Sequence, residues 1–189
     1  ISCKTTRTVN RSATPNYDAT VNAKILMAAY QQKAAEYKAL CYQAYNIARV
    51  SMDQFLKNET TKPRAIMTDI DETVLDNSPY QVHQTLQGKD YDPASWYEWT
   101  SRADADTVPG ALRFFRYAAS KGVEIFYVTN RDEVERNATL LNLQKFGFPN
   151  ADHAHLMLKG ASSSKVPRRD SIARHYELIM QVGDNLNDF

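Results

Sequence analysis

The spacing of apolar residues along the chain predicts a helical N-terminal region. From Ala19 to about Phe55 apolar residues recur every three or four positions, and no proline or glycine interrupts the run. We expect one long helix or two in succession, packed against a larger body, because polar residues fill the other faces. The apolar stripe comprises Tyr30, Ala34, Tyr37, Cys41, Ala44, Ala48, Met52 and Phe55. Such a stripe is more typical of core packing than of a cofactor site.

After a break at residues 58–63 the apolar runs become short and alternate with helical patterns. The four expected strands occupy residues 64–71, 123–129, 155–158 and 178–182. The three expected helices between them occupy residues 109–121, 132–146 and 167–176. Asp132 and Glu135 form the pattern of a capping box at the start of the second helix. The alternation favours an α/β fold, a Rossmann-like parallel sheet with helices on both faces.

The same patterns divide the chain into a leader and one domain. Residues 1–16 are rich in Thr, Ser, Asn and Lys, and we expect a loose leader there. Residues 17–189 are expected to form a single domain. Within it, residues 17–60 would make a helical extension, and residues 77–107 a small cap-like insert after the first strand.

Composition and charge narrow the class of protein. A chain of 189 residues with 43% hydrophobic and 24% charged residues is typical of one globular domain rather than of a disordered chain. The net charge is +1 and no basic run is present, so we expect no nucleic acid polymer as a partner. No stretch is long and apolar enough to span a bilayer. The two cysteines, Cys3 and Cys41, have no metal-type spacing and predict no disulfide framework.

Polar side chains follow the predicted strands at the points where the strands end. They are Asp69 and Asp71 after the first strand, Thr129 and Asn130 after the second, Lys165 after the third, and Asp184 and Asp188 after the fourth. In parallel α/β sheets, ligands bind beyond the carboxyl ends of the strands. Residues two apart on a strand point the same way, so Asp69 and Asp71 could face one site. Such a pair needs a cation or a shared proton to lower its repulsion.

The chemistry of these groups indicates a metal and a phosphate ester. Carboxylates without His or Cys suit magnesium, and a metal together with an ammonium group suits phosphoryl transfer. Lys165 would be the ammonium group, with Lys159 as a competing candidate, and the Thr129 hydroxyl would donate to phosphate. A single Asp-x-Asp is more often a solvated turn or a helix cap. The interpretation therefore rests on the ordered combination at successive strand ends.

These motifs resemble those of the haloacid dehalogenase superfamily. The superfamily has Asp-x-Asp-x-Thr after the first strand, Ser or Thr after the second, then a Lys and an acidic pair. More narrowly, Ile-Asp-Glu-Thr-Val-Leu-Asp-Asn-Ser-Pro-Tyr80 and Gly-Asp-Asn-Leu-Asn-Asp-Phe189 look like the two signatures of bacterial class C acid phosphatases, the lipoprotein-e type. The similarity runs from about Leu26 to the end of the sequence.

The resemblance implies a phosphoric monoester hydrolase. It would be a magnesium-dependent acid phosphatase with 5′-nucleotidase activity that works through an aspartyl-phosphate. Asp69 would attack phosphorus, and Asp71 would act as general acid and then general base. The phosphate-binding residues would be Thr129, Asn130 and Lys165. The magnesium site would comprise Asp69, the Asp71 backbone carbonyl and Asp184, with Asp188 holding a metal-bound water.

The predicted insert contains an aromatic group that could stack on the leaving group of a nucleotide. Its members are Tyr80, Tyr91, Trp96, Tyr97 and Trp99. The resemblance favours Trp96 first and Tyr80 second as substrate-binding residues. A small satellite core under a long loop is the alternative, above all for Tyr97 and Trp99.

The resemblance also bears on location and on competing functions. It implies a protein of the bacterial periplasm or outer membrane, a cell-surface lipoprotein anchored through Cys3, although an ordinary cysteine in a leader fits the residues too. The family carries a C-terminal segment beyond the position of Phe189, which we expect this sequence to lack. The partner would be a small phosphorylated substrate, and a homodimer stays open. The alternatives are a catalytically silent nucleotide-binding or adhesion lipoprotein, and a phosphotransferase.

Overall fold

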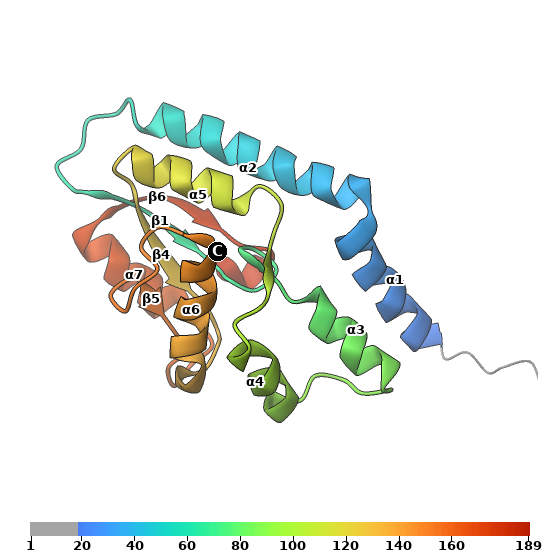
Figure 1. Ribbon diagram of the computed structural model, residues 1–189. Coiled ribbons are helices and arrows are strands. Elements are labelled where there is room, and N and C mark those ends of the chain that lie inside the picture. Colours follow the sequence, from blue (N-terminus) through green and yellow to red (C-terminus); the bar gives the residue numbers. More distant parts are fainter. Residues whose placement is uncertain (1–18) are drawn as a thin grey trace, which may run out of the picture.

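The computed structural model describes residues 19–189 and has a four-stranded sheet at its centre (Figure 1). The strands are β1 (Arg64–Thr68), β4 (Glu124–Val128), β5 (Leu156–Met157) and β6 (Glu177–Val182). Their order is β5-β4-β1-β6, and every neighbouring pair is parallel. β1 is therefore a central strand, hydrogen-bonded on both edges. The α/β fold with a parallel sheet is confirmed.

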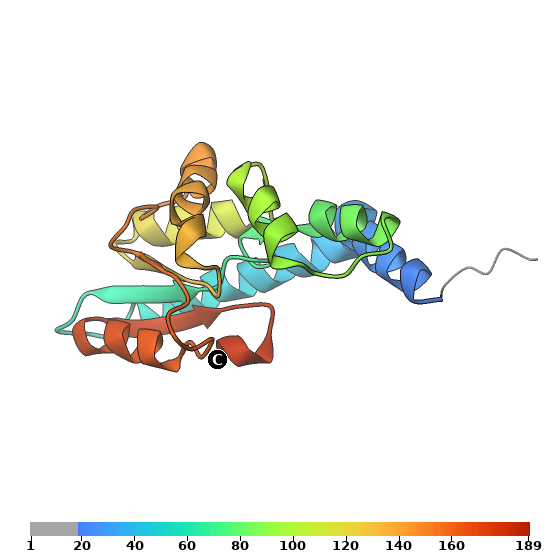
Figure 2. The ribbon, with the colours of Figure 1, turned by 90° about the horizontal axis from the view of Figure 1, so that it is seen from below.

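Helices cover both faces of this sheet (Figure 2). They are α5 (Ala111–Ser120) and α6 (Arg136–Phe146) on one face, and α7 (Val166–His175) on the other. Successive residues of a strand pack on opposite faces of the sheet. Ile66 and Ile125 pack with Phe115 of α5, whereas Met67 packs with Ile172 of α7. Because both faces are covered, the strands read as continuous apolar runs rather than as alternating ones.

The ends of α6 follow signals in the sequence. The short 3₁₀ helix η1 (Glu133–Glu135) leads into α6, and the predicted capping box of Asp132 and Glu135 is present. The Asp132 N–H donates to the Glu135 carboxylate at 2.7 Å. α6 ends at Gly147, whose φ of 72° lies in the left-handed region that glycine adopts without strain. These two devices fix where the helix starts and stops.

The N-terminal region forms two helices in succession, as one of the two alternatives had it. α1 (Ala19–Lys33) and α2 (Ala35–Phe55) meet at Ala34, whose backbone is extended with φ −70° and ψ 129°. α1 lies along α3 (Ser78–Leu86), and α2 lies along α5 (Figure 1). The break at Ala34 therefore lets one apolar segment serve two different neighbours.

The predicted apolar stripe of this region is only partly right. Tyr30 and Phe55 are 44% and 47% exposed, and Tyr45, which the stripe omitted, is buried. Only part of α2 rests on α5, where the Tyr45 ring lies 5.6 Å from that of Phe114. The ends of the stripe extend past this contact and face solvent. Cys41 packs against the edge of the core, as expected.

The segment between β1 and α5, which holds the predicted insert, is built of short helices and strands. It contains β2 (Leu75–Asp76), α3, α4 (Pro93–Ser101) and β3 (Asp106–Thr107). β2 and β3 pair antiparallel and join the two helices to the rest of the chain. Asp92 caps α4 by accepting the Ser95 N–H at 2.9 Å, and Pro93 occupies the first turn.

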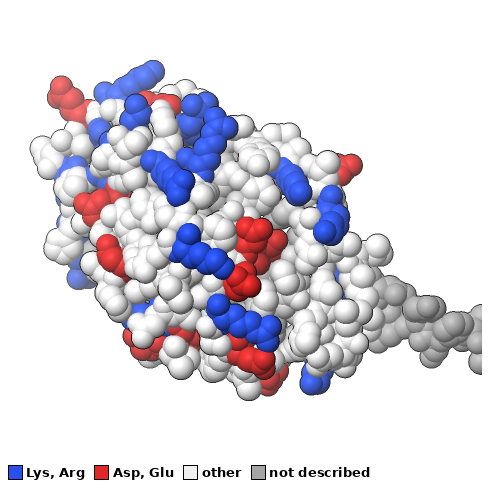
Figure 3. All heavy atoms as spheres, viewed as in Figure 1, with Lys and Arg blue, Asp and Glu red and all other residues white. Residues whose placement is uncertain are grey.

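The surface of the described part shows no single dominant charge on the face seen in Figure 3, where acidic and basic side chains are interspersed. Among the helices of residues 19–189, none combines the length and the apolar character that crossing a bilayer requires. The expected leader at residues 1–16, and with it the candidate lipid-bearing Cys3, lies outside the described residues.

Candidate active site

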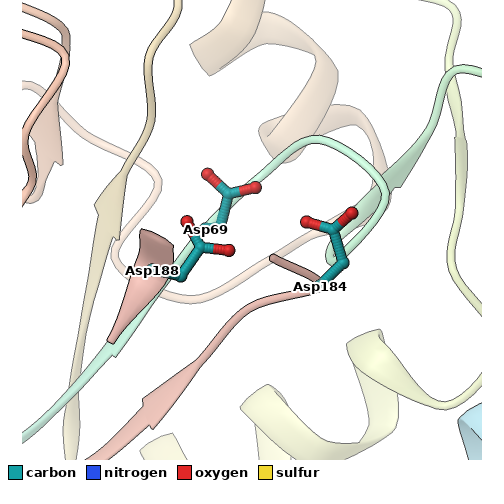
Figure 4. A group of neighbouring side chains, drawn as sticks. All are labelled: Asp69, Asp184 and Asp188. Carbon is teal, nitrogen blue, oxygen red and sulfur yellow. The ribbon is translucent and has the colours of Figure 1, made fainter. Parts of the chain in front are cut away.

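Three carboxylates lie together beyond the carboxyl ends of β1 and β6 (Figure 4). Asp69 directly follows β1, Asp184 follows β6, and Asp188 lies in the short 3₁₀ helix η2 (Leu186–Asp188). One oxygen of each lies within 4.8 Å of the others. The Asp69 N–H donates to the Val182 carbonyl at 2.9 Å, which holds the end of β1 against the end of β6. Neighbouring parallel strands thus deliver their acids to one edge.

The loop after β6 brings Asp188 back onto the sheet by a close approach at Gly183. A Cβ at Gly183 would lie 2.6 Å from the carboxyl carbon of Asp188, so only glycine leaves room for this carboxylate. Asp188 accepts the Asn185 N–H through Oδ2 at 3.0 Å, and the Asn185 side chain accepts the Asn187 N–H at 3.0 Å. Since Oδ2 is used in this way, Oδ1 is left for the site.

Lys165 is the cation of the cluster. It lies at the start of α7, its side chain is 5% exposed, and its ammonium group contacts the carboxylates of Asp69 and, at 2.6 Å, Asp188. The competing candidate Lys159 pairs instead with Asp132 at 2.9 Å. The structure therefore brings Lys165 rather than Lys159 to the aspartates.

One ammonium group does not balance three carboxylates. Burial raises the pKa of Asp69 to about 7; Lys165 opposes this effect, and Asp71 adds to it. Burial and the neighbouring Asp188 also raise the pKa of Asp184. The donors are all carboxylate oxygens, the set that hard divalent cations prefer. In charge and in chemistry, the cluster fits a divalent metal ion.

Asp71 has other hydrogen-bond partners than Asp69, although its charge still acts on the Asp69 carboxylate. β1 ends at Thr68, and the chain then turns through Glu72, which has a φ of 57°. Asp71 Oδ1 instead accepts the Arg131 guanidinium at 2.7 Å and the Asn77 amide at 2.8 Å. A metal contact through the Asp71 backbone carbonyl stays a prediction.

The two polar residues after β4 have different surroundings. Thr129 is fully buried; its hydroxyl accepts the Arg131 N–H at 3.1 Å and lies 3.4 Å from Asp71 Oδ2. Asn130 is exposed and accepts Arg168 Nη2 through its side-chain oxygen at 2.8 Å. Thr129 is thus beside Asp71 and Asn130 beside an arginine, and phosphate binding by either stays a prediction.

The predicted substrate-binding pair lies in the insert. The rings of Tyr80 and Trp96 meet edge to face with their centroids 5.1 Å apart. Both line a cavity of about 270 Å³ that Glu72 and Asn77 also border. Trp99 takes the alternative, structural role, since its indole N–H donates to the Asn77 side-chain oxygen at 2.9 Å.

Sequence reasoning missed three residues of this region. Arg131 and Asn77 hold Asp71, and Glu72 is a half-buried carboxyl whose pKa burial, followed by the charge of Asp71, raises to about 8. Asn77 lies inside the signature that ends at Tyr80, and Arg131 lies two residues after Thr129. A lone Arg or Asn at such a place has no spacing signal of its own.

Comparison with known proteins identifies relatives of this arrangement. The whole chain, residues 1–189, matches the family described as HAD superfamily, subfamily IIIB (Acid phosphatase). The crystal structure of the class C acid phosphatase from Bacillus anthracis with tungstate bound is similar, with a TM-score of 0.86, 38% identity, and coverage of 89% of this chain and 71% of that one.

Two curated plant proteins are also similar. Acid phosphatase 1 of Solanum lycopersicum is 27% identical over 128 residues, which are 64% of this chain and 49% of that protein. Vegetative storage protein 2 of Arabidopsis thaliana is 26% identical over 165 residues, 84% of this chain and 60% of that protein. The chain thus spans about half to three fifths of the length of these relatives.

Proposed function

The chain belongs to the acid phosphatases of subfamily IIIB in the haloacid dehalogenase superfamily, and from this premise we propose that it hydrolyses phosphate monoesters in a magnesium-dependent reaction. Nucleoside 5′-monophosphates are proposed among its substrates. The observation behind the proposal is the placing of Asp69 at the end of the central strand, against Lys165 and beside two further carboxylates. The family match and the similar Bacillus anthracis enzyme support the same reaction.

In the proposed mechanism Asp69 is the nucleophile. A carboxylate oxygen of Asp69 attacks phosphorus, and the bond between phosphorus and the leaving alcohol oxygen breaks. Asp71 gives a proton to that oxygen, and later takes one from the water that hydrolyses the aspartyl-phosphate and frees Asp69. Two carboxylates with different partners suit two roles, because Asp69 is paired with an ammonium and Asp71 with a guanidinium.

Phosphate binding and charge balance fall to the residues around them. Lys165, Thr129 and Asn130 are the proposed phosphate contacts, and the buried ammonium of Lys165 would offset charge on the phosphoryl group. Asp69, Asp184 and Asp188 would hold Mg²⁺, Asp188 through a water. When bound, the cation would neutralise part of the charge of both ester and carboxylates. Magnesium is favoured because every donor is an oxygen.

Phosphate release from p-nitrophenyl phosphate and from a panel of 5′-nucleotides, with and without Mg²⁺, tests the proposal. Asp69→Asn should lower the rate by about 10³-fold or more, since removal of a nucleophile leaves only binding effects. Asp170→Asn is a matched control, because Asp170 is an exposed carboxylate of α7. Thermal melting shows whether each variant is folded. Substantial release by Asp69→Asn, or release unaffected by a chelator, would contradict the assignment.

A non-catalytic member of the family is the competing candidate. The name of the Arabidopsis relative, a vegetative storage protein, motivates it. A silent protein would bind a nucleotide and Mg²⁺ without releasing phosphate. Isothermal titration alongside the release assay separates the two, because only the enzyme consumes the nucleotide during the titration.

We further propose export to the bacterial periplasm or cell surface with a lipid on Cys3. Two features support this proposal: Ile1-Ser2-Cys3 resembles the end of a bacterial lipobox, in which the cysteine takes the lipid, and the chain resembles lipoprotein-type phosphatases. Radiolabelled palmitate should be incorporated when the protein is expressed with a lipoprotein signal, and Cys3→Ser should abolish the label. Label retained by Cys3→Ser would assign the lipid to another residue.

A further inference from the structure

Arg131 lies between Asp71 and the Trp96 ring of the insert. We propose that Arg131 is a positioning residue that orients Asp71 so that its Oδ2 atom transfers the proton. The proposal rests on the proposed phosphatase function. It concerns which oxygen of Asp71 acts and what holds the carboxyl group in place.

The guanidinium of Arg131 is fixed on three sides. Its side chain is 2% exposed, and Nη2 and Nε donate to Asp71 Oδ1 at 2.7 Å and 3.1 Å. Nη1 donates to the Thr139 hydroxyl of α6 at 3.0 Å. The guanidinium carbon lies 5.8 Å from the centre of the Trp96 ring. The guanidinium has several N–H donors in one plane and is held by Asp71 on one side and Thr139 on the other. It can therefore fix the orientation of a carboxylate, which a single point charge such as an ammonium cannot do.

The two oxygens of Asp71 are held unequally. Oδ1 accepts three hydrogen bonds, two from Arg131 and one from the Asn77 amide at 2.8 Å. Oδ2 has only the longer contacts with Arg131 Nε at 3.3 Å and with the Thr129 hydroxyl at 3.4 Å. The three donors therefore occupy Oδ1, whereas Oδ2 has room for a further, shorter hydrogen bond to the leaving alcohol or to water. The geometry therefore makes Oδ2 the atom that exchanges protons.

This arrangement matches both halves of the reaction. As the Asp69–phosphorus bond forms and the bond to the alcohol oxygen breaks, the proton on Asp71 Oδ2 moves to that oxygen. Asp71 is then a carboxylate, and the buried Arg131 guanidinium stabilises it. In the second half a water oxygen bonds to phosphorus, its proton returns to Oδ2, and the Asp69–phosphorus bond breaks. Arg131 stays protonated throughout, as an arginine does.

The dependence on the leaving group distinguishes positioning from other roles. A nitrophenolate departs without a proton, whereas an alkoxide needs one, so misplacing Asp71 should slow only the second kind of ester. Loss of a phosphate contact or loosening of the fold would slow both kinds alike. The measured quantity is kcat/KM, which reports the steps up to departure of the alcohol.

We would compare wild type, Arg131→Met and Arg131→Lys on p-nitrophenyl phosphate, phenyl phosphate and glycerol 2-phosphate with Mg²⁺. Arg131→Met should lose about 10²-fold or more on glycerol 2-phosphate and less than about 10-fold on p-nitrophenyl phosphate. Arg131→Lys should recover part of the activity lost on glycerol 2-phosphate, since lysine keeps the positive charge but lacks the planar set of N–H donors. The matched control is Arg102→Met, at an exposed arginine that directly follows α4 and pairs with Glu98; this variant should behave as wild type.

Equal losses on all three esters, or no loss on any, would overturn the inference. If Arg131→Met does not fold, Thr139→Val replaces it: the variant removes the acceptor of Nη1 and should give a smaller loss that again grows from the nitrophenyl to the alkyl ester. A uniform effect in Thr139→Val would also overturn it. If the wild-type protein releases phosphate from none of the esters, the proposed function itself is wrong. This outcome differs from one in which the wild type is active and only the role of Arg131 is wrong.

Discussion

Replacing Asp69 with asparagine should stabilise the metal-free protein at pH 8, although it removes the proposed nucleophile. Burial raises the pKa of Asp69 to about 7 from its ordinary value of 3.8, against the opposing effect of Lys165. The folded protein therefore keeps the proton in a range where the unfolded chain has released it. The buried Asp69 carboxyl therefore lowers the free energy of unfolding progressively as the pH rises above about 4. The lowering is complete above about pH 7.

The size of the effect follows from the same shift. Raising the pKa from 3.8 to about 7 corresponds to about 4 kcal/mol, at about 1.4 kcal/mol per pH unit. The Asp69 side chain is 10% exposed, so solvent screens little of this cost. Asparagine keeps the shape and an oxygen for the Lys165 ammonium but has no charge. At about 2–4 °C per kcal/mol for a domain of this size, the melting temperature at pH 8 should rise by about 10 °C.

Thermal and urea unfolding of wild type and Asp69→Asn in a chelator, from pH 4 to pH 8, measures the difference. The two proteins should be alike at pH 4 and should diverge as the pH rises to 7. Asp170→Asn, in which an exposed carboxylate of α7 is replaced, should show no such divergence. Saturating Mg²⁺ at pH 8 should raise the stability of wild type more than that of Asp69→Asn, because the cation offsets the charge that the variant lacks.

Two outcomes would refute this reasoning. If Asp69→Asn melts at or below wild type at pH 8 in the chelator, the ion pair with Lys165 outweighs burial, and the Asp69 carboxylate is stabilised rather than strained. If the two proteins differ by the same amount at pH 4 and pH 8, the effect is one of packing and not of charge.

Two further predictions concern the loop that holds Asp188 and the hydrophobic core. Gly183→Ala should weaken Mg²⁺ binding by about 10-fold or more in isothermal titration, because the new Cβ would overlap the Asp188 side chain. The control is Gly160→Ala, whose Cβ would meet nothing within 4 Å and which should leave binding unchanged. Equal affinities of the two variants would contradict the close approach at Gly183. Phe115→Ala should lower the free energy of unfolding in urea by about 3–5 kcal/mol, since this ring is fully buried, while Leu141→Ala, at an exposed site, should change it by less than about 0.5 kcal/mol.

The aspartate cluster could be predicted because its signals are regular. Short apolar runs mark the strands of a doubly covered sheet, and parallel strands end at one edge, so Asp69, Asp184 and Asp188 were expected to meet. The strand-end rule does not predict the hydrogen-bond partners of Asp71, which are Arg131 and Asn77. β1 stops at Thr68, before Asp71, so the alternation of side chains along a strand does not extend to it.

Other parts depend on contacts that no local pattern encodes. The insert's helices α3 and α4 have nine residues each, too few turns for periodicity to stand out among aromatics and turn formers. Tyr45 of α2 is buried because it lies over α5. Tyr30 of α1 does not lie over α5 and is exposed. Arg131 acquires its place from Asp71 and Thr139, 60 and 8 positions away along the chain.

The position of β6 next to β1 has a consequence for biosynthesis. Arg64 of β1 pairs with Glu177 of β6, 113 positions later in the chain. While the ribosome is still making those residues, one edge of β1 has no partner, and Asp69 lacks both the Val182 carbonyl and the two other acids of its cluster. Nascent or prematurely terminated chains should therefore expose the hydrogen-bonding edge of the strand that bears the nucleophile, and such edges recruit other chains. Chaperone binding to this strand would protect the chain until β6 is made.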